Sequence, residues 1–239
     1  MMWMEWSARS LWNNVARGRM NARFFLGTWL AMAILPGTVL CGAAQAPKNT
    51  PEPAAAGTGK TEYNGGLVSP PLPKPKFTLT DTSGAAFDFS AKTRGYTTLL
   101  FFGYTHCPDM CPLEMLTIAQ AFKKIPPAIA DRFKVVFVTT DPGRDTPQAL
   151  RAWLDHFDKR FIGLTGDQAV IDAAQVAANL TPAKKSLVRA DGNYEVGHST
   201  FVFAYTKDNL AHLVYPAGMK EEDLAHDLPF LATETWTNH

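Results

Sequence analysis

Two cysteines lie close together in the middle of the chain, Cys107 and Cys111, in the segment THCPDMCP. A thiolate binds soft metal ions and also attacks disulfides, so a close pair of cysteines is suited to either chemistry. Their C-x3-C spacing lets the two sulfurs approach one another or converge on one ion. The pair alone therefore leaves three interpretations equal: a metal site, a redox-active dithiol, or a structural disulfide in an oxidising compartment.

A histidine that could complete a metal site lies much later in the chain, in the segment VGHST. His198 precedes the apolar run TFVFAY (Thr200–Tyr205). Apolar strands alternate with helices from Thr97 onward, and a hairpin and a helix close the chain, which predicts a thioredoxin-like order of elements. In that order this loop lies opposite the cysteine loop. Dithiol oxidoreductases of that fold place a cis-proline there, but this chain has no proline between Pro182 and Pro216. Two thiolates and one imidazole form a soft set of three ligands, suited to Cu(I) and also able to hold Cu(II) or zinc. We therefore favour a copper site over a loop histidine without a ligand role.

An acidic segment, DPGRDTP (residues 141–147), follows a second apolar run and is expected at the same edge of the sheet. Asp141 is a candidate to approach the metal or to support its ligands. The alternative is a plain turn before a helix that Thr146 caps, with Arg144 pairing with a nearby carboxylate. His106 adjoins the first cysteine and could tune it. Packed or solvent-exposed roles are expected for the remaining histidines, His156, His212, His226 and His239.

The elements that would position these residues alternate between strands and helices. Continuous apolar runs such as TTLLFF and KVVFVTT predict buried strands, and apolar residues at helical spacing predict the helices between them. The order of elements predicts an α/β protein with a thioredoxin-like fold, in which helices flank a central mixed sheet. The expected elements are a hairpin around Ser83-Gly84, strands at 97–102, 134–140 and 161–164, helices at 112–124, 148–157, 167–179 and 221–231, and a final hairpin of strands 200–205 and 210–215.

The cysteine pair falls where the first buried strand ends and the next helix begins. Proline suits the first position of a helix, so Pro112 predicts that the helix begins there and that Cys111 is its N-cap. A thiol at that position faces the positive end of the helix dipole, which lowers its pKa. We therefore expect Cys111 to form a thiolate more readily than an ordinary cysteine.

Length and composition restrict the class of protein. The chain has 239 residues and is 46% hydrophobic, enough for one compact domain with appendages but not for two full domains. Its formal net charge of +1 carries no electrostatic signature of nucleic-acid binding, which excludes that class of partner. Three cysteines, one of them in the apolar leader, are too few for a disulfide-stabilised scaffold.

The first 46 residues are predicted to be a signal peptide or an N-terminal membrane anchor. Four arginines precede an uncharged stretch, Phe24–Ala46, which ends in the A-x-A pattern of a cleavage site. That pattern favours cleavage over an uncleaved anchor, and the bulk of Leu40 argues against lipidation of Cys41. Each case places the body outside the cytoplasm, in the periplasm or at the outer face of the inner membrane. Residues 47–76 are predicted to be a Pro/Ala-rich linker, and residues 77–239 the thioredoxin-like copper-binding domain.

Four motifs in order resemble the Sco/SenC family of copper chaperones, and the resemblance spans residues 77 to about 231. A C-x3-C pair alone would be a weak match, but four motifs in family order are a specific one. The matching segments are FFGYTHCPDMCP (Phe101–Pro112), DPGRDTP (Asp141–Pro147), FIGLTG (Phe161–Gly166) and VGHST (Val196–Thr200).

The resemblance implies a thioredoxin fold, tethered to or exported across a membrane, that binds copper through Cys107, Cys111 and His198. Family members help to assemble the dinuclear copper centre of cytochrome c oxidase, as copper donors, as thiol reductants of that centre's cysteines, or as both. The implied partner is the copper-site subunit of the oxidase, with other periplasmic copper or thiol-redox proteins as further partners. The implied role is metal delivery by a metallochaperone rather than substrate turnover by an enzyme.

The sequence departs from the family pattern at one position. The family often has an acidic residue before the histidine, where this chain has Gly197. A missing carboxylate would leave His198 less firmly oriented and lower the affinity for copper. The main alternative function is an extracytoplasmic thiol:disulfide oxidoreductase without a stored metal. A peroxidase lacks support because no P-x3-T-x2-C arrangement leads to Cys107, and a copper-sensing or redox-sensing role stays open.

Overall fold

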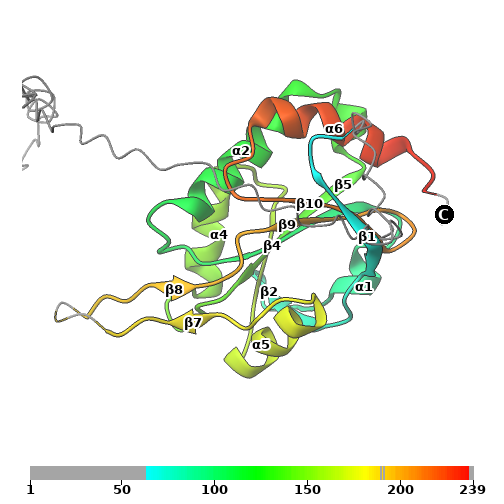
Figure 1. Ribbon diagram of the computed structural model, residues 1–239. Helices are drawn as coiled ribbons and strands as arrows, with labels where there is room; N and C mark the ends of the chain where they lie inside the picture. Colours follow the sequence, from blue (N-terminus) through cyan, green and yellow to red (C-terminus); the bar gives the residue numbers. More distant parts are fainter. Residues whose placement is uncertain (1–62, 189, 191, 237–239) are drawn as a thin grey trace, which may run out of the picture. The chain divides into compact units, whose positions relative to one another are not determined.

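An eight-stranded mixed sheet forms the centre of the structure, a computed structural model that describes residues 63–188, 190 and 192–236 (Figure 1). β4 pairs in parallel with β5 and β5 with β6, while the other neighbouring strands are antiparallel. The predicted α/β class with a central mixed sheet is confirmed. The strand order is β1 (Gly66–Pro73), β10 (Leu210–Tyr215), β9 (Val202–Tyr205), β4 (Thr97–Gly103), β5 (Phe133–Thr139), β6 (Ile162–Thr165), β2 (Thr78–Asp81) and β3 (Ala86–Asp88).

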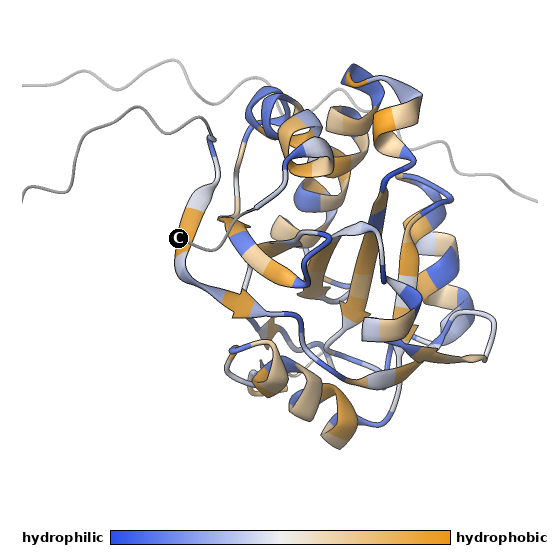
Figure 2. Ribbon diagram, turned by 90° about the vertical axis from the view of Figure 1, so that its right-hand side faces the viewer, coloured by the Kyte–Doolittle hydropathy of each residue, from blue (hydrophilic) through white to orange (hydrophobic). Residues whose placement is uncertain are grey.

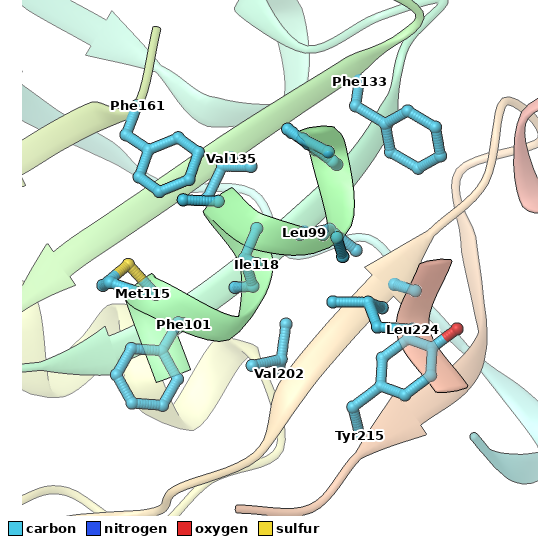
Figure 3. Close-up of a cluster of buried hydrophobic side chains, with 14 of the residues drawn as sticks. Leu99, Phe101, Met115, Ile118, Phe133, Val135, Phe161, Val202, Tyr215 and Leu224 are labelled. Carbon is cyan, nitrogen blue, oxygen red and sulfur yellow. The ribbon is translucent and has the colours of Figure 1, made fainter. Parts of the chain in front are cut away.

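The two central strands are buried on both faces because their sequences are apolar at nearly every position. Every residue of β4 is buried, and in β5 only Lys134 is partly exposed. Side chains alternate between the two faces of a strand. Leu99 and Phe101 therefore join one hydrophobic cluster, part of which is drawn in Figure 3, while Leu100 and Phe102 join another.

Helices cover both faces of the sheet, as two buried faces require. Buried side chains of α2, α4 and α6 join the cluster around Phe101, and those of α1 and α5 join the cluster around Phe102. Figure 2 shows hydrophobic strands between helices that carry both apolar and polar positions. The helices are α1 (Phe89–Lys92), α2 (Met110–Lys124), α3 (Pro127–Ala130), α4 (Pro147–Asp155), α5 (Gln168–Ala177) and α6 (Glu221–Thr233).

The elements around the predicted site follow the sequence pattern closely. Thr146 is the N-cap of α4, its hydroxyl accepting a hydrogen bond from the Ala149 N–H at 3.2 Å, and Pro147 is the first helical residue. The final hairpin is confirmed by the antiparallel pairing of β9 with β10. Because β4 is parallel to β5 and antiparallel to β9, the ends of β4 and β5 meet the start of β9 at one edge of the sheet.

The last part of the predicted linker belongs to the sheet. Residues 66–73 form β1, which pairs antiparallel with β10. Just before it, the buried carboxylate of Asp227 accepts hydrogen bonds from the backbone N–H groups of Asn64 and Gly65, each at 2.9 Å. The predicted domain boundary at residue 76 is therefore wrong, because strand pairing and the Asp227 carboxylate fix a segment whose prolines are typical of a linker.

The predicted leader, residues 1–46, and residues 47–62 of the linker lie outside the described residues. Everything that the structure describes belongs to a single compact unit. Among the helices of this described part, none combines the length and the apolar character that crossing a bilayer requires.

A two-stranded arm stands apart from the main sheet. Its strands, β7 (Lys184–Lys185) and β8 (Val196–Gly197), pair antiparallel with each other and form a separate sheet. We call residues 183–188 and 192–197 the arm, and Figure 1 shows it projecting from the body of the domain. The sequence did not predict these strands, because two residues are too few to show a periodic pattern. His198 directly follows the arm.

Candidate metal centre

The cysteine loop, residues 104–109, connects the end of β4 to α2. The Cys107 N–H donates to the Tyr104 carbonyl at 3.2 Å, which turns the loop back on itself. Cys107 is partly exposed, while Cys111 is completely buried. Gly103 makes this packing possible, because a Cβ at that position would lie only 2.9 Å from the Cys111 Sγ. A side chain at residue 103 would therefore displace the buried sulfur.

Cys111 is not the N-cap that its position before a proline predicted. α2 begins at Met110, so Cys111 is its second residue and Asp109 is the N-cap. Pro112 is still within the first turn, where a proline removes no N–H that the helix would use. The Cys111 N–H instead donates to the Cys107 Sγ at 3.4 Å. Cys107 therefore supplies the sulfur that faces the N-terminal turn of the helix.

The two cysteines differ in acidity. The hydrogen bond from the Cys111 thiol holds the pKa of Cys107 far below its ordinary value; burial opposes this shift, and the backbone N–H groups of Asp109 and Cys111 add to it. The hydrogen bond to Cys107, together with burial, raises the pKa of Cys111. The predicted lowering of the Cys111 pKa is therefore wrong, and Cys107 is the more acidic of the two thiols.

The imidazole of His198 is oriented by its own backbone neighbour. Its Nδ1 lies 2.7 Å from the Ser199 carbonyl oxygen, which can only accept a hydrogen bond. In the neutral ring Nδ1 therefore carries the proton, and Nε2 keeps a free lone pair. That Nε2 lies 3.4 Å from the Cys111 Sγ. The rings of Phe101 and Tyr104 meet the imidazole edge to face, with centroids 6.0 and 5.6 Å away, and confine it from the side.

The three predicted ligands come together at this edge of the sheet. The Sγ atoms of Cys107 and Cys111 and a ring nitrogen of His198 all lie within 4.8 Å of one another. Metal–sulfur bonds are about 2.3 Å and metal–nitrogen bonds about 2.0 Å long, so two donors on one ion lie at most about 4.6 Å apart. A small inward movement therefore brings all three donors onto one soft ion such as Cu(I). Across the described ranges, no other group of three His, Cys, Asp or Glu donors lies this close.

Comparison with known proteins agrees with this geometry. The pattern that describes the SCO1/SenC family matches residues 69–232, well over half of the chain. The chain belongs to the SCO1/SenC family. The matched residues include the cysteine loop, the DPGRDTP segment and His198 in one continuous stretch.

Individual SCO1/SenC relatives agree with the assignment. An SCO2-like protein of Rickettsia prowazekii is 33% identical over 147 residues, which cover 61% of this chain and 71% of that protein. The structure of Bradyrhizobium japonicum ScoI with copper bound is 32% identical, with a TM-score of 0.60, and covers 67% of this chain and 99% of that one. Solution structures of apo Sco1 from Thermus thermophilus are 30% identical, with a TM-score of 0.62, and cover 70% and 95% of the two chains. The predicted thioredoxin-like fold is confirmed.

Asp141 lies at the same edge of this SCO1/SenC domain but outside the group of three donors. Its buried carboxylate pairs with Arg144, accepts a hydrogen bond from the Tyr194 hydroxyl at 2.8 Å, and lies 3.2 Å from the Lys185 Nζ. The expected pairing of Arg144 with a nearby carboxylate is confirmed. Asp141 therefore contacts the arm rather than the two sulfurs.

Asp145 is a buried residue of the site whose contacts the sequence analysis missed. Its carboxylate accepts hydrogen bonds from the Thr105 N–H at 3.0 Å, the Thr105 hydroxyl at 2.6 Å and the Thr139 hydroxyl at 2.6 Å. It also lies 3.6 Å from the Nδ1 of His106, whose ring is half exposed and outside the donor group. Asp145 thus fixes the cysteine loop. The available signal was that Thr105 and Asp145 follow neighbouring parallel strands.

Proposed function

We propose that this chain is an extracytoplasmic copper-binding protein that delivers copper to the copper-site subunit of cytochrome c oxidase. The observation that carries the proposal is the approach of Cys107, Cys111 and His198 to within 4.8 Å in a member of the SCO1/SenC family. A relative, Bradyrhizobium japonicum ScoI, has been solved with copper bound, and the soft donor set here suits Cu(I). Copper is the cargo of this protein, and its three ligands belong to the chain itself.

Stepwise ligand exchange would pass the ion to a partner without releasing it into solvent. Cys107 is the accessible cysteine and Cys111 is fully buried, so an incoming thiolate of the partner replaces Cys107 first. A second partner thiolate then replaces Cys111, and His198 is released last. The first two steps each exchange one thiolate for another and the departing imidazole is neutral, so the charge on the ion stays compensated throughout.

The predicted leader supports the extracytoplasmic location. Its four arginines precede an uncharged stretch, the pattern of a segment that directs the following domain across a membrane. Close cysteine pairs oxidise readily in such compartments. Loading with copper would therefore depend on a reductant for the pair, and other periplasmic thiol-redox proteins are the partners that fit this need.

Copper titration tests the three-ligand site. The reduced full-length chain, in detergent, is titrated with Cu(I) against a chelator of known affinity, alongside His198→Ala and the matched control His156→Ala, an exposed histidine. We expect one ion per chain, at least about tenfold weaker binding in His198→Ala, because one ligand of three is lost, and no change in His156→Ala. Weak binding that is indifferent to His198 would exclude the three-ligand site.

Delivery needs a separate measurement. The copper-loaded chain is mixed with the reduced soluble domain of an oxidase copper-site subunit, and the absorption of the dinuclear centre is followed. Transfer faster than from free copper buffered at the same concentration supports delivery, and equal rates argue against it.

A second function, thiol:disulfide oxidoreductase without stored metal, is favoured by the difference between the two cysteines. A partly exposed thiolate beside a buried thiol is the arrangement of an attacking and a resolving cysteine. Cys107 would attack a partner disulfide, whose leaving sulfur takes a proton. Cys111 would then displace the partner from the mixed disulfide, leaving the pair oxidised and the partner reduced. This function would be favoured if the His198→Ala variant still reduces a partner disulfide although it no longer binds copper.

A further inference from the structure

The three donors of the proposed copper site come from two different parts of the chain. Cys107 and Cys111 belong to the body, at the junction of β4 and α2, whereas His198 directly follows β8 of the arm. The strands of the arm pair with each other and not with the main sheet. After the arm, the chain does not rejoin the main sheet until β9 begins at Val202. Contacts of side chains must therefore decide where the arm, and with it His198, lies against the body.

Tyr194 joins the arm to the body through three contacts. Its hydroxyl donates to the Asp141 carboxylate, with oxygens 2.8 and 3.1 Å away. Its ring lies beneath the Arg144 guanidinium, whose central carbon is 3.7 Å from the ring centroid. Its backbone carbonyl accepts a hydrogen bond from the Arg144 Nη1 at 3.2 Å. The Lys185 Nζ, 3.2 Å from Asp141, adds a fourth link, but this side chain is half exposed and its ion pair is screened by water.

The groups that hold Tyr194 are themselves fixed. Asp141 is fully buried at the end of β5, and its own N–H donates to the Thr139 hydroxyl at 3.0 Å. Burial alone would raise the pKa of Asp141, but hydrogen bonds from Arg144, Tyr194 and Lys185 outweigh it and hold the pKa below its ordinary value. The carboxylate is therefore charged at neutral pH, where it is the strong acceptor that Tyr194 needs.

We propose that Tyr194 is a positioning residue for copper binding: held by Asp141 and Arg144, it keeps the arm where the Nε2 of His198 stays beside the Cys111 Sγ. The present separation of those two atoms is 3.4 Å. The inference rests on the proposed function, because loss of the Tyr194 contacts is expected to lower the affinity for copper. It also assigns a role to Asp141, which supports the site through the arm and not as a ligand.

A double-mutant cycle separates positioning from general stability. Tyr194→Phe removes the hydroxyl contact with Asp141 and keeps the ring beneath Arg144. In the full-length chain we expect Cu(I) affinity to fall about tenfold in Tyr194→Phe and to stay unchanged when Tyr194→Phe is added to His198→Ala, because Tyr194 acts only through the histidine. The matched control is Tyr96→Phe, an exposed tyrosine before β4 whose ring contacts Lys134; we expect no effect.

A second readout needs no metal. In the reduced, copper-free chain the imidazole of His198 lies edge to face against Tyr104, with ring centroids 5.6 Å apart. NMR should show cross-relaxation between the ring protons of these two residues in wild type and in Tyr96→Phe. The signal should weaken at least severalfold in Tyr194→Phe, because the hydrogen bonds between the Tyr194 hydroxyl and the Asp141 carboxylate, which help to hold the arm and its histidine, are lost.

The results distinguish a failure of the positioning role of Tyr194 from a failure of the three-ligand copper site. If His198→Ala weakens copper binding but Tyr194→Phe does not, the inference is wrong and the proposed function stands. The inference is also overturned if Tyr194→Phe lowers Cu(I) affinity equally in the wild type and in His198→Ala, since a general structural role would act in both backgrounds. If copper binding is indifferent to His198, the three-ligand site fails. In that case, an undiminished Tyr104–His198 signal in Tyr194→Phe would overturn the positioning role too, and a lost signal would support it.

Discussion

The Ser199 carbonyl does for His198 what a carboxylate does in many metal sites. A ligating imidazole commonly gives its second N–H to a carboxylate or a backbone carbonyl, which fixes the tautomer and the ring orientation. Here the carbonyl oxygen is 2.7 Å from Nδ1. The histidine therefore has an orienting partner although Gly197 takes the place of the acidic residue that the family often carries.

A substitution at Gly197 tests whether the Ser199 carbonyl is enough to orient His198. The nearest atom to an added Cβ there is the Lys184 carbonyl oxygen at 3.7 Å, an ordinary contact, so a side chain fits. We expect Gly197→Asp and its neutral control Gly197→Asn to change Cu(I) affinity by less than about threefold, because the orienting hydrogen bond already exists. The measurement is chelator competition. A gain of tenfold or more in Gly197→Asp alone would show that a carboxylate was missing after all.

At the scale of elements, the cysteine loop depends on a carboxylate from the segment that enters α4. Asp145→Asn replaces an acceptor of three hydrogen bonds with an amide whose NH₂ group faces the donors of Thr105 or Thr139. We expect the free energy of unfolding to fall by about 2 kcal/mol, because a buried donor loses its partner. Urea unfolding of the reduced protein measures it.

The control for this substitution is Asp131→Asn. Asp131 is an exposed carboxylate 3.7 Å from Arg160, and exposed ion pairs contribute little to stability. We expect a change below about 0.5 kcal/mol. Equal effects of Asp131→Asn and Asp145→Asn would mean that the loop does not depend on its buried acceptor.

Elements with strong patterns were predictable, and elements held only by tertiary contacts were not. β4 and β5 are continuous apolar runs, and α4 carries its Thr-Pro start, so all three appear where the sequence places them. β1 and the arm lack such patterns; pairing with β10 and contacts such as Tyr194 with Asp141 define them. The N-cap was misplaced because a proline is tolerated anywhere in the first helical turn, not only at its first position.

The same division holds for the site. Residue types and fold order were enough to bring Cys107, Cys111 and His198 together. The lowered pKa was assigned to Cys111 and belongs to Cys107, because acidity depends on which sulfur donates to the other and on burial, neither of which spacing reveals. Asp145 was missed for a related reason, since its importance lies in fixing Thr105, a partner forty residues away in the chain.

At the scale of the whole molecule, the ammonium group of Lys74 is buried at the far end of the sheet, and burying its charge lowers the stability of the fold. Lys74 is 6% exposed and donates to the hydroxyls of Thr93 and Thr98 at 3.2 and 3.3 Å. Burial lowers its pKa from 10.5 to about 8, against a weaker opposing effect of Asp208. The folded protein therefore binds fewer protons than the unfolded chain between these pH values, and its stability rises with pH across that window.

Replacing this lysine should stabilise the protein at neutral pH. We expect Lys74→Met to raise the free energy of unfolding by about 2 kcal/mol at pH 7, because no buried charge must then be desolvated. The advantage should shrink as the pH rises from about 8 towards 10.5, where the folded wild type has lost the charge. Urea unfolding at pH 7 and pH 10 measures it. Lys76→Met, an exposed neighbour, is the control, and a gain independent of pH would contradict the electrostatic explanation.

The prolines of β1 have a further consequence. Within the part of the chain that the structure describes, β1 is the outermost strand on its side of the sheet, with only β10 beside it. An outer strand offers unpaired backbone groups onto which another polypeptide can add, the first step of aggregation. Pro70, Pro71 and Pro73 have no backbone N–H, so no chain can find a regular row of donors there. The residues that made this segment resemble a linker thus protect the domain from self-association.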